Sequence, residues 1–150
     1  MMRRRVLVAG AAALAASRNA AVKARPSGVT MIYVSAWDCP PCHVWQRNHW
    51  PTFQGSPEFA RIDWYKIDAP AIRTAYEDRY WQAPKDRDGV AVERDLRRFR
   101  DEAGLTRGVP RWVIVKDGAV VLNGKPASGS GFLSWTDDVL PALRKHLAVV

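Results

Sequence analysis

The sequence predicts an α/β fold in which a central mixed sheet of about four strands is flanked by helices. Two observations support this prediction. Short runs of β-branched and aromatic residues alternate with segments of helical periodicity, in the order strand, helix, strand, helical region, strand, strand, helix. The last two strands, residues 111–115 and 119–122, are joined by Lys116-Asp117-Gly118, a sequence typical of a tight hairpin turn.

The first 24 residues are typical of a targeting segment. Arginines at positions 3–5 precede an apolar run, residues 6–16, which is shorter than the roughly 20 residues of a membrane span and suits the core of a signal peptide. The small residue Ala24 allows cleavage of the peptide bond that follows it. We therefore expect a signal peptide over residues 1–24, export to the bacterial periplasm without a stable membrane span, and one domain over residues 25–150.

Much of the net charge belongs to this leader. The full sequence has 23 basic and 15 acidic side chains, a net charge of +8. Without the five basic residues of the leader, 18 basic side chains face 15 acidic ones, a net charge of +3. The hypothesis of a nucleic-acid partner therefore loses its main support, the high positive charge. All seven tryptophans lie beyond the leader and can contribute to one core.

In the first half of this domain, the sequence predicts two strands and two helical pieces. Residues 29–34 are β-branched, aromatic and almost without polar members, as in a buried central strand. A helix is predicted from Pro40 to Trp50, ended by Pro51. Ser56, followed by a proline, signals a short second helical piece through Ala60. Residues 62–68 then alternate as a second strand.

The second half contains the longest helical region. Residues 71–106 are predicted to be helical in two pieces, separated by a charged break at residues 84–89 and ended by Gly104. The dense charges of the second piece have both signs and indicate a solvated face. A last helix is predicted between residues 131 and 147, where Pro141 either kinks the helix or marks its start.

Cys39 and Cys42 are the only cysteines, and they stand at the start of the first predicted helix. A bridge between them would close a very small loop and restrict the unfolded chain little, so a chemical role explains them better than a stabilising one. Unpaired N–H groups and the positive pole of the helix favour a thiolate at Cys39, the candidate nucleophile. Cys42, one turn further in, is the candidate resolving thiol.

The neighbours of the two cysteines modulate this chemistry. Pro40 and Pro41 suit the first helical turn but offer no N–H to the Cys39 sulfur, which then depends on the amide of the second cysteine. The carboxylate of Asp38 would oppose thiolate formation if it pointed at the sulfur. His43 would assist the thiolate if it were protonated, because it lies one helical turn after the first cysteine.

The chain beyond the leader resembles the thioredoxin superfamily in its minimal form. Three landmarks carry the resemblance: the strand that enters Trp37-Asp38-Cys39-Pro40-Pro41-Cys42, the strand end at residues 65–68, and residues 103–110, which lead into the hairpin. The resemblance implies a thioredoxin fold with a helical insertion before a cis-proline loop. By the same resemblance, Val109-Pro110 is a cis bond that faces the dithiol, and the Val109 backbone pairs with a substrate segment.

The function that this resemblance implies is thiol:disulfide exchange with partner proteins. It requires no bound cofactor and no metal, and we expect a monomer that meets protein substrates and a redox partner protein. The direction of exchange is left open. The residues expected to contact substrate are Trp37, Pro40, Pro41, Val109 and Pro110.

Two departures from the thioredoxin pattern stand out. Asp38 separates the tryptophan from the first cysteine, where the two are usually adjacent in thioredoxins. The strand before the motif carries Tyr33, six residues before Cys39, where thioredoxin has a buried acid that helps proton transfer to the inner cysteine. The resemblance therefore leaves this chain without that base.

Two alternatives use the same residues. Cys39-Pro40-Pro41-Cys42-His43 also fits the attachment motif of c-type haem, with His49 or His146 as the second iron ligand. The strand-rich pattern argues against it, because small c-type cytochromes are helical. The other alternative is a copper site formed by the two cysteines with His43 or His49. A four-ligand structural zinc site usually needs a second ligand pair, and the sequence has no other cysteine.

Overall fold

A computed structural model describes residues 27–82, 89–124 and 132–148 of the chain. The leader expected over residues 1–24 and nearly all of the break expected at residues 84–89 lie outside this part. In the described part, no helix combines the length and the apolar character that crossing a membrane requires.

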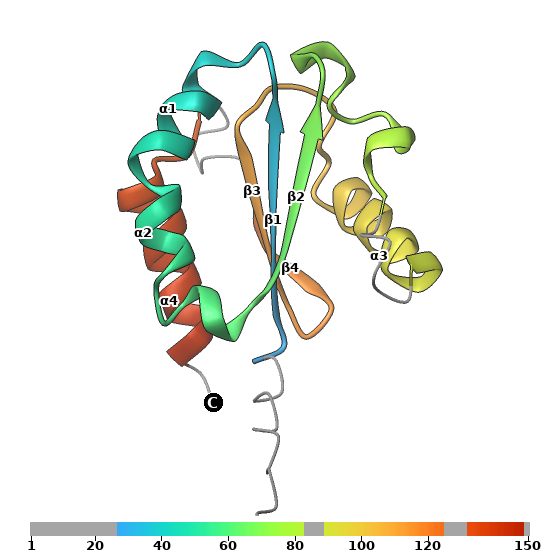
Figure 1. The fold of residues 1–150 in the computed structure, drawn as a ribbon. Helices are drawn as coiled ribbons and strands as arrows, with labels where there is room; N and C mark the ends of the chain where they lie inside the picture. Colours follow the sequence, from blue (N-terminus) through green and yellow to red (C-terminus); the bar gives the residue numbers. More distant parts are fainter. Residues whose placement is uncertain (1–26, 83–88, 125–131, 149–150) are drawn as a thin grey trace, which may run out of the picture.

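The core of the fold is one four-stranded mixed sheet with the strand order β2-β1-β3-β4 (Figure 1). Strand β1 (Val29–Ala36) pairs in parallel with β2 (Asp63–Ala69) and antiparallel with β3 (Arg111–Lys116). Strand β4 (Ala119–Asn123) completes the sheet antiparallel to β3. The predicted α/β fold is confirmed, and the arrangement is thioredoxin-like.

The predicted hairpin joins β3 to β4. Asp117 and Gly118 both have positive φ, 50° and 82°, as the two central residues of a type I′ turn require. Pairing between β3 and β4 shifts register between Ile114 and Val115, which marks a β-bulge. The extra residue is Val121 of β4, and a bulge increases the local twist of its strand.

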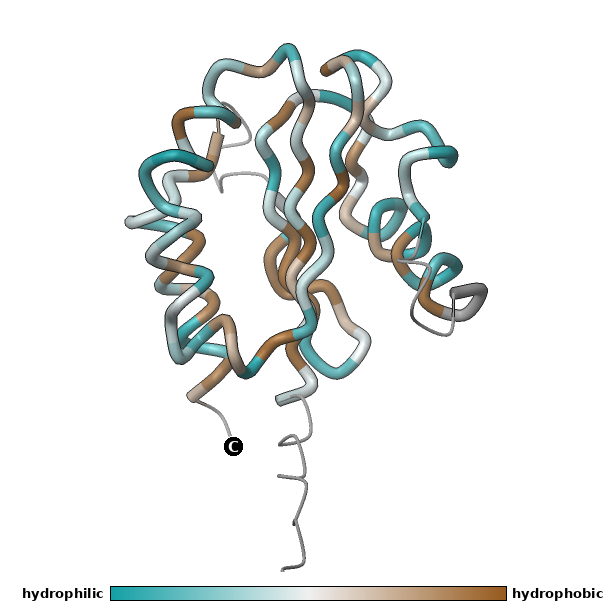
Figure 2. Tube along the Cα trace, viewed as in Figure 1, coloured by the Kyte–Doolittle hydropathy of each residue, from teal (hydrophilic) through white to brown (hydrophobic). Residues whose placement is uncertain are grey.

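Helices cover both faces of the sheet. Helices α1 (Pro40–Asn48), α2 (Trp50–Gln54) and α4 (Leu140–Ala148) lie on one face, and α3 (Gly89–Glu102) lies on the other (Figure 1). Hydrophobic residues recur along the central strands and at intervals along the helices on both sides (Figure 2). The result is two buried clusters, one on each face, with β1 contributing to both.

Two prolines mark helix starts. The predicted end of the first helix at Pro51 is wrong, because α1 already ends at Asn48 and Pro51 lies in the first turn of α2. A proline has no N–H. It therefore cannot continue a helix, but it is tolerated in the first turn, where that N–H has no partner within the helix. Pro141 lies in the first turn of α4, after one π-helical turn (Trp135–Val139), so the helix begins near this proline.

The first piece of the predicted helical region differs from the expectation. The structure has two three-residue 3₁₀ helices, Ile72–Thr74 and Asp78–Tyr80, instead of one continuous helix. Contacts with distant residues override the helical periodicity here, since the Ile72 amide donates to the Asp38 Oδ1 at 2.7 Å and the Tyr76 hydroxyl donates to the Gly108 carbonyl at 2.6 Å. The second piece is confirmed as α3.

Candidate functional site: a buried disulfide beside an apolar groove

The two cysteines are joined in a disulfide at the N-terminus of α1. The S–S distance is 2.08 Å and the Cα atoms are 5.3 Å apart. Cys39 is the N-cap residue of the helix, and the Cys42 amide donates a hydrogen bond to the Cys39 Sγ at 3.2 Å. The amide donor expected from the sequence is therefore in place.

Burial does not distinguish the two sulfur-bearing residues, because Cys39 and Cys42 are both 0% exposed. They belong to the buried cluster on the α3 face of the sheet. That cluster includes Ala75 and Trp81 from the segment after β2, and Val109 from the loop before β3. The disulfide thus lies beneath chain that arrives from two distant parts of the sequence.

A chain of hydrogen bonds fixes Trp37, whose ring is 66% exposed. Its Nε1–H donates to the Asp68 carboxylate at 3.3 Å, and the other oxygen of that carboxylate accepts from the Ser35 hydroxyl at 2.7 Å. The His43 Nε2 lies 2.7 Å from the Trp37 carbonyl. Sequence analysis missed Ser35 and Asp68 as support for the motif. Only the register of β1 and β2, which makes them partners, reveals the pair.

Asp38 connects the motif to the segment after β2. Its Oδ1 accepts a hydrogen bond from the Ile72 amide at 2.7 Å. The same segment reaches the loop before β3, because the Tyr76 hydroxyl donates to the Gly108 carbonyl at 2.6 Å. The sequence singled out Asp38 for its charge. Its role as a backbone anchor depends on a contact between residues 34 positions apart.

The loop before β3 contains the expected cis bond, Val109–Pro110. Val109 belongs to the same buried cluster as the two cysteines. Gly108, just before it, has a φ of +79°, a conformation that favours glycine. Pro110 lies beside Pro40 and Pro41 in the lining of one groove. The structure therefore brings the expected motif and proline loop together.

That groove has a volume of about 500 Å³ and an almost entirely apolar lining. It runs between the start of α1, the proline loop and the chain that enters α4. Val44 and Phe132 are exposed apolar residues of this lining. The indole Nε1–H groups of Trp45 and Trp112 are buried without a hydrogen-bond partner among the described residues. The remaining lining residues are Pro40, Pro41, His49, Pro110, Leu133 and Trp135.

Tyr33 occupies the position where the resemblance places a buried acid. Burial raises the pKa of its hydroxyl to about 12, so the group is neutral at physiological pH. Gln46 Nε2 donates to this hydroxyl, which in turn donates to the Cys42 carbonyl, both at 3.5 Å. The hydroxyl therefore contacts the backbone of the inner cysteine.

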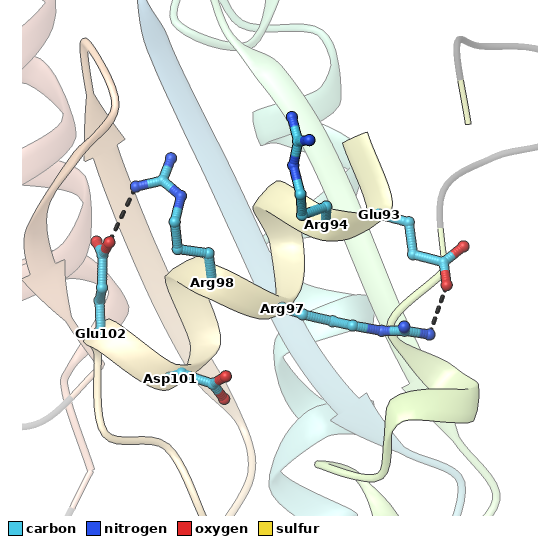
Figure 3. A pocket seen from close by; sticks show the side chains of 6 residues that line it. All are labelled: Glu93, Arg94, Arg97, Arg98, Asp101 and Glu102. Carbon is cyan, nitrogen blue, oxygen red and sulfur yellow. Dashed lines mark hydrogen bonds and ion pairs between the residues drawn. The ribbon is translucent and has the colours of Figure 1, made fainter. Parts of the chain in front are cut away.

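A second hollow of about 570 Å³ lies along α3 (Figure 3). Its side chains pair with one another, since Arg97 contacts Glu93 at 2.5 Å and Arg98 contacts Glu102 at 2.9 Å. This agrees with the solvated face of mixed charge that the sequence predicts. No cysteine or histidine lines it, so it offers no chemistry that extends the disulfide site.

The described part of the chain contains no set of ligands for a metal ion. No three side chains of His, Cys, Asp or Glu there are placed to hold an ion together. The two sulfurs are bonded to each other, and the His43 Nε2 is occupied by the Trp37 carbonyl. This geometry supports neither the haem alternative nor the copper alternative.

Comparisons with protein families, curated protein sequences and solved structures found no match to this chain. The fold and the site comprise a thioredoxin-like mixed sheet with a CXXC disulfide at a helix N-terminus, next to a cis-proline loop.

Proposed function

We propose that this chain is a thiol:disulfide oxidoreductase of the thioredoxin superfamily, which exchanges disulfides with partner proteins through Cys39 and Cys42. One observation carries the proposal. The CXXC disulfide caps a helix, and an amide donates directly to the Cys39 sulfur. A helix N-terminus with an N–H aimed at sulfur favours the thiolate, which is the form that both attacks and leaves in exchange.

The exchange follows from this arrangement. A partner thiolate attacks the Cys39 Sγ, the bond to the Cys42 Sγ breaks, and Cys42 leaves as a thiolate that takes a proton from solvent. A second partner thiol then attacks the mixed disulfide and displaces Cys39. The partner becomes a disulfide, and the chain gains two electrons and two protons. The reverse sequence, in which Cys39 attacks and Cys42 resolves, oxidises the chain.

The groove supports a polypeptide as the substrate. It is apolar, it borders the motif and the proline loop, and exposed side chains of Val44 and Phe132 contribute to it. Such surfaces on a protein are typical of interaction sites. In this proposal Trp37, Pro40, Pro41, Val109 and Pro110 contact the substrate segment.

The setting of this reaction is also part of the proposal. The leader at residues 1–24 supports export to the periplasm, an oxidising compartment in which a dithiol can cycle. The protein acts there as a monomer, without a bound cofactor. Fractionation of cells that produce the chain, with and without residues 1–24, tests the location.

The deciding experiment is an equilibrium titration of the purified protein against reduced and oxidised glutathione. Tryptophan fluorescence follows the transition and alkylation counts the thiols. We expect one reversible two-electron transition that is lost in Cys39→Ser and in Cys42→Ser. Its midpoint gives the direction, because about 30 mV is a tenfold change in equilibrium for a two-electron couple. Two thiols that never form a reversible disulfide would refute the proposal.

A further inference from the structure

The segment that follows β2 contributes to the same buried cluster as the disulfide. This segment, residues 70–82, is called the cap here. It starts at the end of the sheet where β1 also passes into α1, and it continues on the α3 side (Figure 1). Ala75 and Trp81 of the cap share a buried cluster with both cysteines, and Ile72 and Tyr76 pack against that cluster. The cap and the sulfurs therefore belong to one packed unit.

Two hydrogen bonds hold the inner half of the cap across the site. The Ile72 amide donates to the Asp38 Oδ1 at 2.7 Å, next to the first cysteine. The Tyr76 hydroxyl donates to the Gly108 carbonyl at 2.6 Å, next to the cis-proline bond. The cap thus bridges the two halves of the site, the motif and the proline loop.

The outer half of the cap is anchored elsewhere. Arg100 of α3 donates to the Tyr76 carbonyl at 2.9 Å and to the Asp78 carboxylate at 2.7 Å. The Trp81 side chain is fully buried and bonds the Ala75 carbonyl. Trp81 packs in the cluster of the cysteines, but the hydrogen bonds described between the cap and the motif or the proline loop come from Ile72 and Tyr76. Opening would break these two bonds and leave the pairing of Asp78 with Arg100 in place.

Exchange requires access that the closed cap denies. The incoming sulfur must reach the Cys39 Sγ, and the rate of exchange depends on that access. Cys39 is 0% exposed, so a partner cannot reach it while the cap is closed. The groove borders the motif on the opposite side, at Pro40 and Pro41, and gives a partner a place to dock before the sulfur is uncovered.

We propose that the cap gates thiol access to Cys39, and that Asp38 and Tyr76 are positioning residues whose hydrogen bonds hold it closed. This inference rests on the proposed function and adds its regulation. A partner thiolate attacks the Cys39 Sγ only in the open form, and Cys42 leaves as the thiolate. A second thiol of the same partner then releases Cys39. The observed rate is the intrinsic rate multiplied by the fraction of open molecules.

The test measures how fast dithiothreitol reduces the disulfide in the full chain, under excess reductant, by tryptophan fluorescence. Dithiothreitol supplies both thiols and leaves as a cyclic disulfide. Tyr76→Phe keeps the ring and removes the hydroxyl, which bonds the Gly108 carbonyl and also interacts with Arg111 of β3. We expect reduction at least about fivefold faster, the factor for one hydrogen bond of ordinary net strength. Asp38→Ala should act similarly, and the double variant should be about 25-fold faster if the two free-energy effects add.

Matched controls separate the gate from other causes. Tyr80→Phe removes the same hydroxyl from a cap residue whose side chain contacts Arg79, and its rate should equal that of the wild type. Asp38→Asn removes the charge beside Cys39 but keeps an oxygen that accepts from the Ile72 amide. The rate of Asp38→Asn should therefore stay well below that of Asp38→Ala. Equal rates for these two variants would assign the effect to charge and overturn the role of Asp38.

Two results overturn the gate itself. One is a Tyr76→Phe rate equal to that of the wild type. The other is an acceleration that Tyr80→Phe shares. If a variant fails to fold, hydrogen exchange of the wild-type Ile72 amide tests the gate instead. A closed cap protects that amide from exchange, and an open cap does not. Failure of the gate differs from failure of the proposed function, because the glutathione titration remains reversible when only the gate is wrong.

Discussion

The two faces of the sheet are built differently. On the face of α1, α2 and α4, aromatic rings pack against one another. The ring centroid of Trp45 lies 4.5 Å from that of Tyr33 and 5.0 Å from that of Trp135. On the α3 face, the cluster consists mainly of aliphatic and small residues around the disulfide, and short 3₁₀ turns cover it.

The strand β1 connects these two environments. Tyr33 points into the aromatic cluster, and its neighbours Ile32 and Val34 point into the cluster of the disulfide, as strand alternation requires. One face thus concentrates large rings from strands and helices, and the other combines a reactive bond with a segment of short 3₁₀ turns. We expect the loss of a buried ring from the aromatic face to cost more stability than the loss of the disulfide.

The largest expected effect is the loss of a ring from the aromatic face. Trp45→Ala removes a buried side chain that touches five other rings, and we expect it to lower the free energy of unfolding by about 3–5 kcal/mol. Urea denaturation measures this. Trp37→Ala, which removes an exposed indole, is the control and should cost about 0.5 kcal/mol or less. Similar losses for both would contradict the contrast between the faces.

The disulfide itself should matter less to stability than that ring. It links residues three apart, and closing so short a loop restricts the unfolded chain by only about 2 kcal/mol. We expect reduction of the bond to lower the free energy of unfolding by no more than this. Urea denaturation of the oxidised and reduced protein measures the difference. A loss as large as that of Trp45→Ala would make the bond a structural element instead.

Tyr33 gives the aromatic face a pH dependence in alkali. Burial raises the pKa of its hydroxyl from 10.0 to about 12, so the folded protein keeps the proton where the unfolded chain loses it. The stability that this shift contributes is fully present below about pH 10 and is lost as the pH rises to about 12. Urea denaturation across this range should show a shallower decline for Tyr33→Phe. Identical pH profiles for variant and wild type would refute the assignment.

The smallest effect is expected at the rim of the aromatic face. Arg144 donates to Glu58 at 2.7 Å, and this hydrogen bond lowers the pKa of the Glu58 carboxyl. The Arg144 side chain is largely exposed, so we expect Glu58→Gln to cost less than about 1 kcal/mol at neutral pH. The contribution is present above the ordinary pKa of 4.5 and is lost on acidification. Thermal unfolding at neutral and acid pH, with and without added salt, measures it.

Local patterns in the sequence predicted much of this fold. The strands and the hairpin follow from residue type and from the Asp117-Gly118 turn, because these signals act within a few residues. The motif at the helix N-terminus is equally local. Pro51 was misassigned because a proline suits both the end of one helix and the start of the next.

The parts that sequence reasoning missed depend on contacts between distant residues. The cap has a helical stripe, but its geometry is set by Asp38 and Gly108, which lie far from it in the chain. The pairing of Ser35 with Asp68 depends on the register of two parallel strands. Neither contact leaves a periodic signal in the sequence.

The bulge between Ile114 and Val115 bears on how the protein avoids self-association through its sheet. A sheet with free edges can template the addition of a foreign strand, and long, flat, apolar edges are the most prone to aggregate. Here β4 has five residues and a twist imposed by the bulge, while the opposite edge, β2, presents the charged side chains of Lys66 and Asp68. Both edges therefore disfavour the growth of intermolecular sheets, even in a chain with seven tryptophans.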